Sequence, residues 1–309
     1  MRARIEAAEH IALIAHLHPD ADSLGSACAM YAHLLRLQKR VTLFCASETI
    51  DRRLAFLPWS EKVTSRWDAH ADLAIAFDCG AVERLGVVPE CALINIDHHS
   101  GNDGFGDLQL VDKEAVSTSA ILMRWFKDEG IKINPKMATA LYAGIADDTL
   151  GFKSKRSDAS VFEMAAELAR SGADLVAANH ALFLRQPLSA LRLKGMMLSE
   201  LALVSDARIA VLKVNRELLE RSGADPEACE SALHESLGLP TVRAALLLRE
   251  RKDGSVKVSL RTDDGIDVGK IATAFGGGGH HFASGFISGG TTMESLASQV
   301  IDTIEKELV

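Results

Sequence analysis

Short, mostly apolar runs separated by longer amphipathic stretches dominate the first half of the chain. These runs occupy residues 11–15, 41–44, 73–77 and 93–96, and each is predicted to be a strand. The first run is too uniformly apolar for a half-exposed strand, so it is predicted to be buried on both faces. A helix is predicted from Asp22 or Ser23, either of which suits an N-cap, to about Arg40. Strands alternating with helical stretches predict a mostly parallel sheet covered by helices, which is an α/β fold.

The second half of the chain has a different order of elements. Helical periodicity predicts helices at 116–130, 135–146, 158–170 and 187–204. The last of these is rich in Leu and Met and is expected to bridge two domains. Beyond about Arg208, a smaller α/β domain with a mixed sheet is predicted, with strands at 209–214, 244–248 and 256–260 and helices at 226–237, 267–274 and 292–307. Asp253-Gly254 lies between two of these strands and is a hairpin signal. We therefore expect domains at 1–186 and 208–309, a helical linker at 187–207, and an active site in the cleft between the domains.

Composition narrows the functional class. The 309 residues are 48% hydrophobic and 25% charged, with a net charge of −8, which argues against an extended basic footprint on duplex nucleic acid. The five cysteines form no CxxC pair, as expected for reduced thiols in a cytosol. Acids at Glu6 and Glu9 argue against a signal peptide, and no apolar stretch reaches the ~18 residues of a membrane span. A cytoplasmic protein without membrane contact is predicted.

Polar residues with metal-binding chemistry follow three of the predicted strands. His16, Asp20 and Asp22 follow the first strand, Asp78 follows the third, and the triplet 97–99 (Asp-His-His) follows the fourth. Carboxyl ends of parallel strands meet at one edge of the sheet, where α/β folds bind ligands. Alone, the two histidines would be compatible with a solvated turn. A further acid pair, Asp147-Asp148, ends a predicted helix.

Crowded carboxylates at one sheet edge would repel each other unless cations neutralise them. Two divalent cations balance four aspartates, and oxygen and imidazole ligands suit Mn²⁺, with Mg²⁺, Fe²⁺, Co²⁺ and Zn²⁺ not excluded. Two such ions ~3.5–4 Å apart activate a shared water toward phosphorus or a carbonyl. Holding a phosphate then requires added positive groups. Candidates are His99 and, on the second domain, Arg261, His280 and the backbone amides of Gly276–Gly279.

Five motifs, in this order, resemble those of the DHH phosphoesterases. They are HxHPDAD from His16, FDCG around Asp78, the DHH triplet, ADDT around Asp148 and GGGGHHFASG from Gly276. The last is similar to the family's associated C-terminal substrate-binding domain. Size and domain content are most similar to the bacterial oligoribonuclease and 3′-phosphoadenosine 5′-phosphate (PAP) phosphatase group.

The resemblance implies a role for each matching residue. One metal would be held by His16, Asp20 and Asp78. A second would be held by Asp22, Asp78, His98 and Asp148, with Asp78 bridging the two. His99 would contact the scissile phosphate, and Asp97 would orient a histidine. The substrate-binding residues would be Arg261, Gly278, Gly279 and His280. Asp148 is preferred over Asp147 because it directly precedes Thr149, as in the family pattern.

The resemblance implies a phosphoesterase that uses two Mn²⁺ ions, or other divalent cations, to hydrolyse short oligoribonucleotides or PAP-type nucleotides. Alternatives are a cyclic-dinucleotide or linear dinucleotide phosphodiesterase, a catalytically idle nucleotide-binding protein and, less favoured, a manganese pyrophosphatase. The chain is too short for the additional nucleic-acid-binding domains of a RecJ-type exonuclease. A homodimer is compatible with the sequence.

Overall fold

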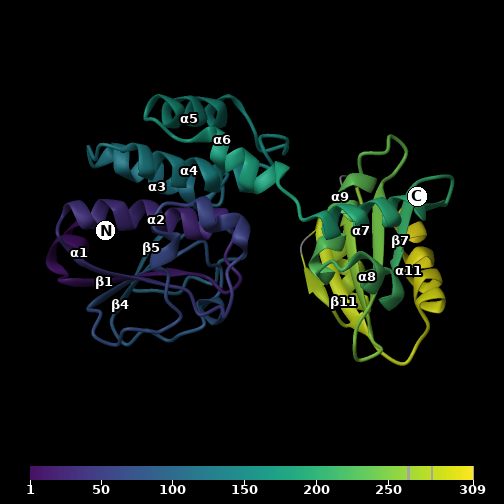
Figure 1. The fold of residues 1–309 in the computed structure, drawn as a ribbon. Coiled ribbons are helices and arrows are strands. Elements are labelled where there is room, and N and C mark those ends of the chain that lie inside the picture. Colours follow the sequence, from purple (N-terminus) through teal and green to yellow (C-terminus); the bar gives the residue numbers. More distant parts are fainter. Residues whose placement is uncertain (263–264, 280, 309) are drawn as a thin grey trace. The chain divides into compact units, whose positions relative to one another are not determined.

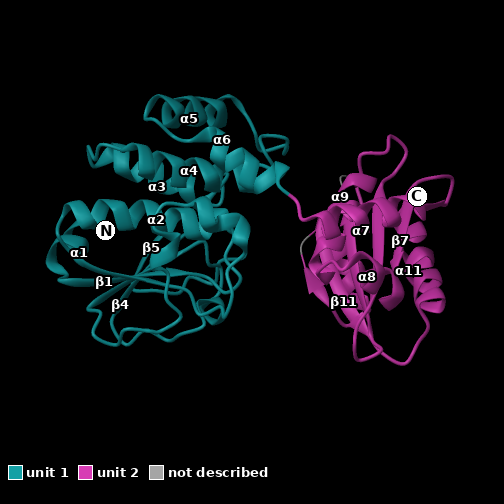
Figure 2. Ribbon diagram, in the orientation of Figure 1, with its two compact units in different colours: residues 1–185 teal, residues 186–309 magenta. Residues whose placement is uncertain are grey.

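The computed structural model describes residues 1–262, 265–279 and 281–308. The chain forms two compact units, unit 1 (Met1–Arg185) and unit 2 (Gln186–Val309) (Figure 2). None of the described helices is both long enough and apolar enough to cross a membrane.

Unit 1 contains a five-stranded parallel sheet with the strand order β2-β1-β3-β4-β5. Its strands are β1 (His10–Ala15), β2 (Arg40–Phe44), β3 (Leu73–Phe77), β4 (Ala92–Asp97) and β5 (Leu108–Val111). The strand order reverses direction between β1 and β3, and such switch points are where open α/β sheets bind ligands. The predicted parallel sheet is confirmed. The short edge strand β5 was not predicted, because its four residues follow a loop rich in Gly and Asp.

The α-helices of unit 1 lie on one side of this sheet (Figure 1). They are α1 (Arg2–Ala7), α2 (Ala21–Arg36), α3 (Thr118–Asp128), α4 (Pro135–Asp148), α5 (Ala159–Arg170) and α6 (Leu175–Asn179), with short helical turns η1 (Arg52–Phe56), η2 (Ser60–Lys62), η3 (Val82–Leu85) and η4 (His180–Leu184). Helices α5 and α6 are packed on α4, whereas the turn η3 packs on the other face of the sheet. Ile11 and Leu13 face the helices. Ile14 faces the opposite side, where the partly buried loop residues Trp67 and Phe105 pack against the same cluster. Both faces of β1 are therefore covered, which explains the uninterrupted apolar run over residues 11–15.

The close packing of α2 on α4 in unit 1 depends on a glycine in α2. A Cβ atom at Gly25 would lie 2.5 Å from the carbonyl oxygen of Ala140 in α4. We expect Gly25→Ala to lower the free energy of unfolding of unit 1 by about 1–3 kcal/mol, because the overlap with backbone outweighs the better helix propensity of alanine. Tryptophan fluorescence during urea unfolding measures the change, since Trp59, Trp67 and Trp125 all lie in unit 1.

The matched control is a helical glycine in open space. A Cβ atom at Gly195 would meet nothing within 4 Å, so Gly195→Ala should be neutral or stabilise unit 2 by up to ~1 kcal/mol, as measured by far-UV circular dichroism. Stabilisation by both substitutions would show that α2 and α4 can separate at little cost.

Unit 2 contains a six-stranded mixed sheet with the order β10-β11-β9-β8-β7-β6, in which only β7 and β8 are parallel neighbours among the described strands. Its strands are β6 (Ala202–Val204), β7 (Ile209–Val214), β8 (Ala244–Glu250), β9 (Val256–Thr262), β10 (Gly278–Gly279) and β11 (Ala283–Ser288). Its helices are α7 (Leu188–Ser199), α8 (Arg216–Ser222), η5 (Pro226–Cys229), α9 (Glu230–Ser236), α10 (Val268–Ala274) and α11 (Met293–Glu307). Helices α10 and α11 cover one face, and α7, α8 and α9 the other. The predicted smaller mixed-sheet domain is confirmed.

One predicted detail of unit 2 is wrong, and one strand was missed. The helix expected over 187–204 ends at Ser199, because Ala202–Val204 pairs with β7 as an edge strand. Strand β11 was not predicted. Its sequence, Ala-Ser-Gly-Phe-Ile-Ser, contains a single β-branched residue, and its pairing with β9 over its whole length specifies its conformation.

Candidate metal centre

The six predicted metal ligands converge at the carboxyl edge of the unit 1 sheet. Ligand atoms lie within 4.8 Å of one another in each of two sets, namely His16, Asp20 and Asp78, and Asp22, Asp78, His98 and Asp148. Asp78 is common to both sets. A third overlapping set joins His99 to Asp78 and His98. The structure thus groups these residues as the sequence resemblance implied, while ligation itself stays a prediction.

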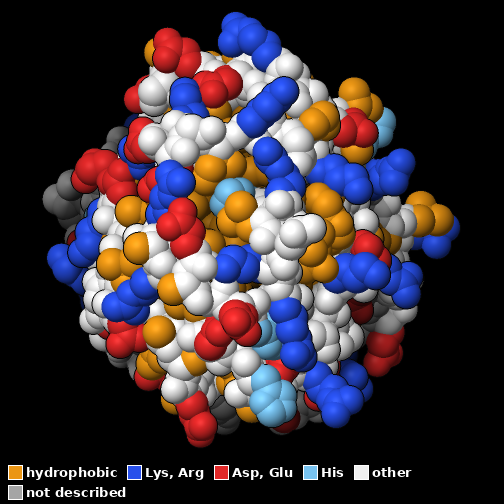
Figure 3. Space-filling model, turned by 90° about the vertical axis from the view of Figure 1, so that its left-hand side faces the viewer, with side chains coloured by type: hydrophobic (Ala, Val, Ile, Leu, Met, Phe, Trp, Pro, Cys, Tyr) orange, Lys and Arg blue, Asp and Glu red, His pale blue; other side chains and the backbone are white. Residues whose placement is uncertain are grey.

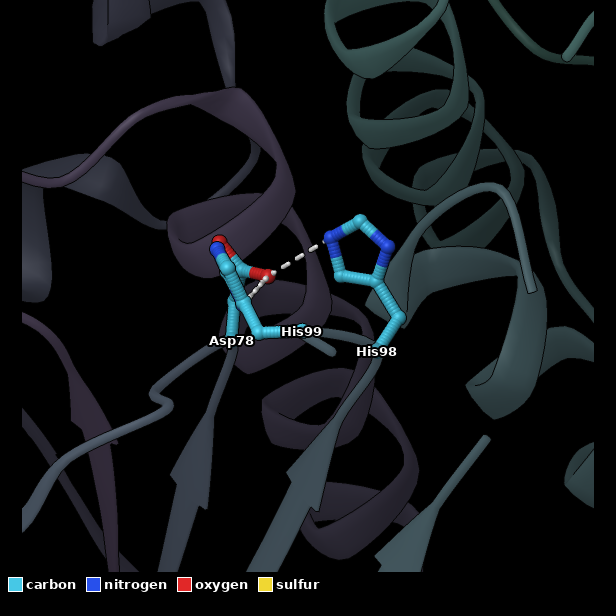
Figure 4. A group of neighbouring side chains, drawn as sticks. All are labelled: Asp78, His98 and His99. Carbon is cyan, nitrogen blue, oxygen red and sulfur yellow. Dashed lines mark ion pairs between the residues drawn. The ribbon is translucent and has the colours of Figure 1, made fainter. Parts of the chain in front are cut away.

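The two oxygens of Asp78 face different histidines. Asp78 Oδ2 lies 3.4 Å from His16 Nε2, whereas Oδ1 lies 3.3 Å from His98 Nε2. Figure 4 shows His98 and His99 both directed at this carboxylate. In each set, another aspartate lies beside the histidine. Asp20 Oδ2 is 3.7 Å from His16 Nε2, and Asp148 Oδ2 is 3.0 Å from His98 Nε2. A carboxylate with one oxygen directed to each set has the arrangement of a bridging ligand.

The turn between β1 and α2 is fixed by its own polar side chains. Asp20, rather than the predicted Asp22 or Ser23, is the N-cap of α2, and its Oδ1 accepts hydrogen bonds from the amides of both those residues. Ser23 Oγ accepts a hydrogen bond from the His16 amide at 3.1 Å and donates one to the Phe77 carbonyl at 3.1 Å. The hydroxyl therefore ties the ends of β1 and β3 together beside Asp78.

The backbone at Asp78 adopts a conformation that few residues tolerate. Its φ is +59°, in the left-handed region that Asp and Asn enter more readily than other side-chain-bearing residues. The Asp78 amide donates to the Ile96 carbonyl at 2.9 Å, and the Thr118 hydroxyl donates to Asp78 Oδ1 at 3.0 Å. These bonds hold the carboxylate, which is almost completely buried, at one position.

Asp22 belongs to α2, and its fully buried side chain lies at the N-terminus of α3. Its two oxygens accept hydrogen bonds from the amides of Thr118 at 2.6 Å and Ser119 at 2.8 Å. Amides at a helix N-terminus stabilise negative charge. A Cβ atom at Gly144 of α4 would overlap Asp22 and Ser119, so this close approach requires glycine.

The two adjacent aspartates at the end of α4, Asp147 and Asp148, lie in different environments. Asp147 Oδ2 accepts a hydrogen bond from the Ala21 amide at 3.1 Å. Asp148 Oδ2 is buried and makes no hydrogen bond of acceptable geometry to any described residue, although His98 Nε2 lies nearby. An unsatisfied buried carboxylate oxygen that faces other ligand atoms fits a cation. The geometry supports Asp148, and not Asp147, as the ligand.

The electrostatics of the cluster also fit divalent cations. Burial and the neighbouring carboxylates Asp148 and Asp78 raise the pKa of Asp22 well above its ordinary value. Burial and Asp78 raise the pKa of Asp148 to about 6, against the opposing effect of His98. Burial disfavours the charged form of Asp78, but hydrogen bonds from His16 and His98 outweigh it and lower its pKa. Without cations, protons bound to some of these groups must therefore offset part of the repulsion between the carboxylates.

The histidines are oriented for metal ligation. Nδ1 of His16 lies 2.8 Å from the Leu17 carbonyl, and Nδ1 of His98 lies 3.2 Å from the Ala115 carbonyl. When Nδ1–H donates to a carbonyl, Nε2 is left with its lone pair directed into the cluster, as is usual for metal-binding histidines. Burial lowers the pKa values of His16 and His98, but adjacent aspartates raise them to about 10 and 11, so a bound cation would displace their protons.

His99 and Asp97 form a pair beside the ligand cluster. Asp97 is fully buried, and its Oδ1 accepts a hydrogen bond from His99 Nδ1 at 2.7 Å. Its Oδ2 accepts a second one from Asn102 Nδ2 at 2.6 Å. Burial disfavours charge on Asp97, but these two hydrogen bonds outweigh burial and lower its pKa. The half-buried His99 is therefore held with its Nε2 away from Asp97.

Several residues of the centre were not predicted. Thr118 and Ser23 position Asp78 and His16, Asn102 holds Asp97, and Arg84 contacts His16. The only sequence signal for Thr118 is the polar run Ser117-Thr118-Ser119 at the start of a predicted helix. Ser23 lies in the first turn of α2 and was considered only as an N-cap, while Asn102 and Arg84 are single polar residues in a loop and in the turn η3, where solvent exposure is the ordinary expectation.

The predicted substrate-binding residues lie in unit 2, except His99. Arg261 is half-buried on β9, and its Nη2 donates to Glu230 Oε2 at 2.9 Å. Gly278 and Gly279 form β10, where Gly279 has a φ of +143° and a Cβ atom there would lie 2.5 Å from Ser284 Cα. His280 lies outside the described residues.

Comparison with known proteins identifies the family. Residues 10–145 match the model of the DHH family N-terminal domain, and residues 206–308 match that of the DHHA1 domain. The bifunctional oligoribonuclease and PAP phosphatase NrnA of Thermus thermophilus is 31% identical over 307 residues, covering 96% of this chain and 90% of that protein. The chain belongs to the DHH family. The Bacillus subtilis protein of the same name is 27% identical over 281 residues, covering 89% of this DHH chain and 88% of the relative.

Solved structures agree with this assignment at the level of the fold. An exopolyphosphatase-related protein from Bacteroides fragilis has a TM-score of 0.91 at 24% identity, covering 98% of this chain and 94% of that one. An exonuclease RecJ bound to manganese has a TM-score of 0.54 at 17% identity, covering 98% and 92%. The two DHH-family units are thus a shared scaffold, and the acidic and histidine cluster of unit 1 is suited to divalent metal.

Proposed function

We propose that the chain is a divalent-metal-dependent phosphoesterase that hydrolyses short oligoribonucleotides, PAP-type nucleotides or both. The single observation that carries the proposal is the shared Asp78, which has one oxygen directed to each of two ligand sets. The family, together with the oligoribonuclease and PAP phosphatase activities for which the NrnA relatives are named, supports the substrate class. On the face shown in Figure 3, Lys and Arg side chains are interspersed with acidic ones, which suits short substrates better than long duplexes.

Two Mn²⁺ ions are the proposed cofactors. His16, Asp20 and Asp78 would hold one, and Asp22, Asp78, His98 and Asp148 the other. Bound divalent cations would lower the pKa of a coordinated water and stabilise charge on phosphate oxygens. The manganese-bound RecJ neighbour is compatible with this choice of metal.

The protein's own groups supply orientation and charge. His99, fixed through Nδ1 by Asp97, would present Nε2–H to an oxygen of the scissile phosphate. Arg261, held by Glu230, and the backbone of Gly278 and Gly279 would bind the remainder of the nucleotide. We place the activity in the cytoplasm.

A product-resolved substrate panel tests the proposal. Purified protein with Mn²⁺ should release mononucleotides from di- to pentaribonucleotides or phosphate from PAP, and excess EDTA should abolish both because the carboxylate cluster then lacks its cations. Cyclic and linear diadenylates, single-stranded DNA and pyrophosphate complete the panel. A clear preference for pyrophosphate, or tight nucleotide binding without turnover, would contradict the proposal and favour a pyrophosphatase or an idle binding protein.

A further inference from the structure

Arg84 brings a cation to the edge of the ligand cluster. It lies in η3, between β3 and β4, a few residues after Asp78, and is exposed. Its Nη2 lies 3.0 Å from Nδ1 and 3.2 Å from Nε2 of His16. No ion pair joins Arg84 to a carboxylate among the residues that the structure describes. The guanidinium therefore has no direct ion-pair partner among these residues.

The turn that carries Arg84 is firmly attached to the turn that carries His16. The Leu17 amide donates to the Arg84 carbonyl at 2.8 Å, and the neighbouring Leu85 is fully buried. Gly86 ends the turn with a φ of +65°, and a Cβ atom there would overlap Ala46 and lie 3.3 Å from Leu17 Cγ. Arg84 is thus presented by rigid backbone, which reduces the entropy lost when its side chain binds a ligand.

A role in orienting His16 does not explain Arg84. His16 Nδ1 already faces the Leu17 carbonyl, which sets the ring orientation without help. A guanidinium so close to a metal ligand also repels the cation that the ligand would hold. The arrangement makes chemical sense if a third, negatively charged group enters the site.

The charge balance identifies that group. Two divalent cations would neutralise Asp20, Asp22, Asp78 and Asp148, which leaves the negative charge of a phosphate uncompensated. His99 approaches Asp78 Oδ1, whereas His16, with Arg84 against it, approaches Oδ2. Arg84 and His99 therefore flank the bridging carboxylate on different sides.

We propose that Arg84 binds a non-bridging oxygen of the substrate phosphate at the metal centre, opposite His99. This inference rests on the proposed function. A planar guanidinium forms charge-assisted hydrogen bonds to phosphate oxygens, often two at once. Phosphate would then be recognised by Arg84 in unit 1 as well as by Arg261 in unit 2.

The test compares three variants. Arg84→Gln removes the charge, Arg84→Lys keeps it without the planar fork, and Arg4→Gln removes an exposed arginine of α1, which precedes β1 at the opposite edge of the sheet. Turnover of a diribonucleotide with Mn²⁺ gives kcat and KM. Calorimetry gives the Kd of inorganic phosphate for the Mn²⁺-loaded protein and the Kd of Mn²⁺ itself.

Arg84→Gln should lower kcat/KM and weaken phosphate binding, each by about 10- to 100-fold, with Mn²⁺ affinity unchanged or tighter. Arg84→Lys should recover part of both losses, and Arg4→Gln should match the wild type. Weaker Mn²⁺ binding with unchanged phosphate affinity would overturn the proposal and make Arg84 a positioning residue for His16. Wild-type protein that binds phosphate but turns over no substrate would refute the proposed function. The phosphate Kd values of the variants would still test the role of Arg84 in that case.

Discussion

Asp78→Asn should reduce metal-dependent hydrolysis by about 1000-fold or more and leave the fold of unit 1 intact. Asp78 is the one side chain shared by all three ligand sets that the described residues form. An amide has one oxygen instead of two and carries no charge, so it cannot serve two cations. Losing their alignment removes several kcal/mol of transition-state stabilisation, and about 1.4 kcal/mol corresponds to tenfold in rate.

Asparagine is a better replacement than alanine on structural grounds. Residue 78 has a φ of +59°, which Asn accepts readily and Ala does not. The side-chain carbonyl that remains in Asp78→Asn can still accept the Thr118 hydroxyl. Far-UV circular dichroism and tryptophan fluorescence should therefore match the wild type, so that lost turnover reports the site. Diribonucleotide cleavage with Mn²⁺ measures the effect, and substantial activity in Asp78→Asn would refute a bridging role.

The sequence was sufficient to predict where the site would form. Apolar strands separated by helical stretches predicted a parallel sheet, and parallel strands align their carboxyl ends, so His16, Asp78 and His98 had to meet at one edge. Asp22 and Asp148 come from helices. Their meeting with Asp78 depends on the close packing of α2, α3 and α4, which periodicity alone does not specify.

The supporting residues could not be predicted for a physical reason. Thr118 and Asn102 act through single hydrogen bonds to Asp78 and Asp97, which belong to other elements of the chain. Gly144 matters only because α4 passes close to Asp22. Such contacts depend on distances of a few tenths of an ångström between packed elements, whereas hydrophobic patterns specify only which face of an element is buried.

Metal-free protein should lose stability in unit 1 as the pH rises from 6 to 9. The pKa of Asp148 is raised from 3.8 to about 6, so the stability that its protonation contributes is fully present below pH 3.8 and is mostly lost by pH 6, and the decline above pH 6 comes from the two histidines. The pKa values of His16 and His98 are raised from 6.5 to about 10 and 11, so their contributions are present below pH 6.5 and decline toward those values. Asp78, with a lowered pKa, loses its contribution only in acid. Urea unfolding in EDTA, followed by tryptophan fluorescence, measures this loss, and a flat profile would contradict it.

Asp148→Asn should then be more stable than the wild type in EDTA at pH 8, by about 1–3 kcal/mol, because it removes one of the charges that repel each other. Added Mn²⁺ should reverse the order. Saturating metal at 100 times its Kd stabilises the folded state by about 2.7 kcal/mol, and the variant lacks a ligand that this stabilisation requires. The carboxylates would thus be retained at the expense of metal-free stability because they bind cations.

Asp147→Asn is the matched control for this reversal. Its side chain caps the Ala21 amide, and an asparagine oxygen can accept the same hydrogen bond. It should therefore keep the wild-type gain in stability with Mn²⁺. Loss of that gain in Asp147→Asn but not in Asp148→Asn would move the metal ligand to Asp147. A metal-free Asp148→Asn less stable than the wild type would show instead that the His98–Asp148 pair stabilises the fold by more than carboxylate repulsion destabilises it.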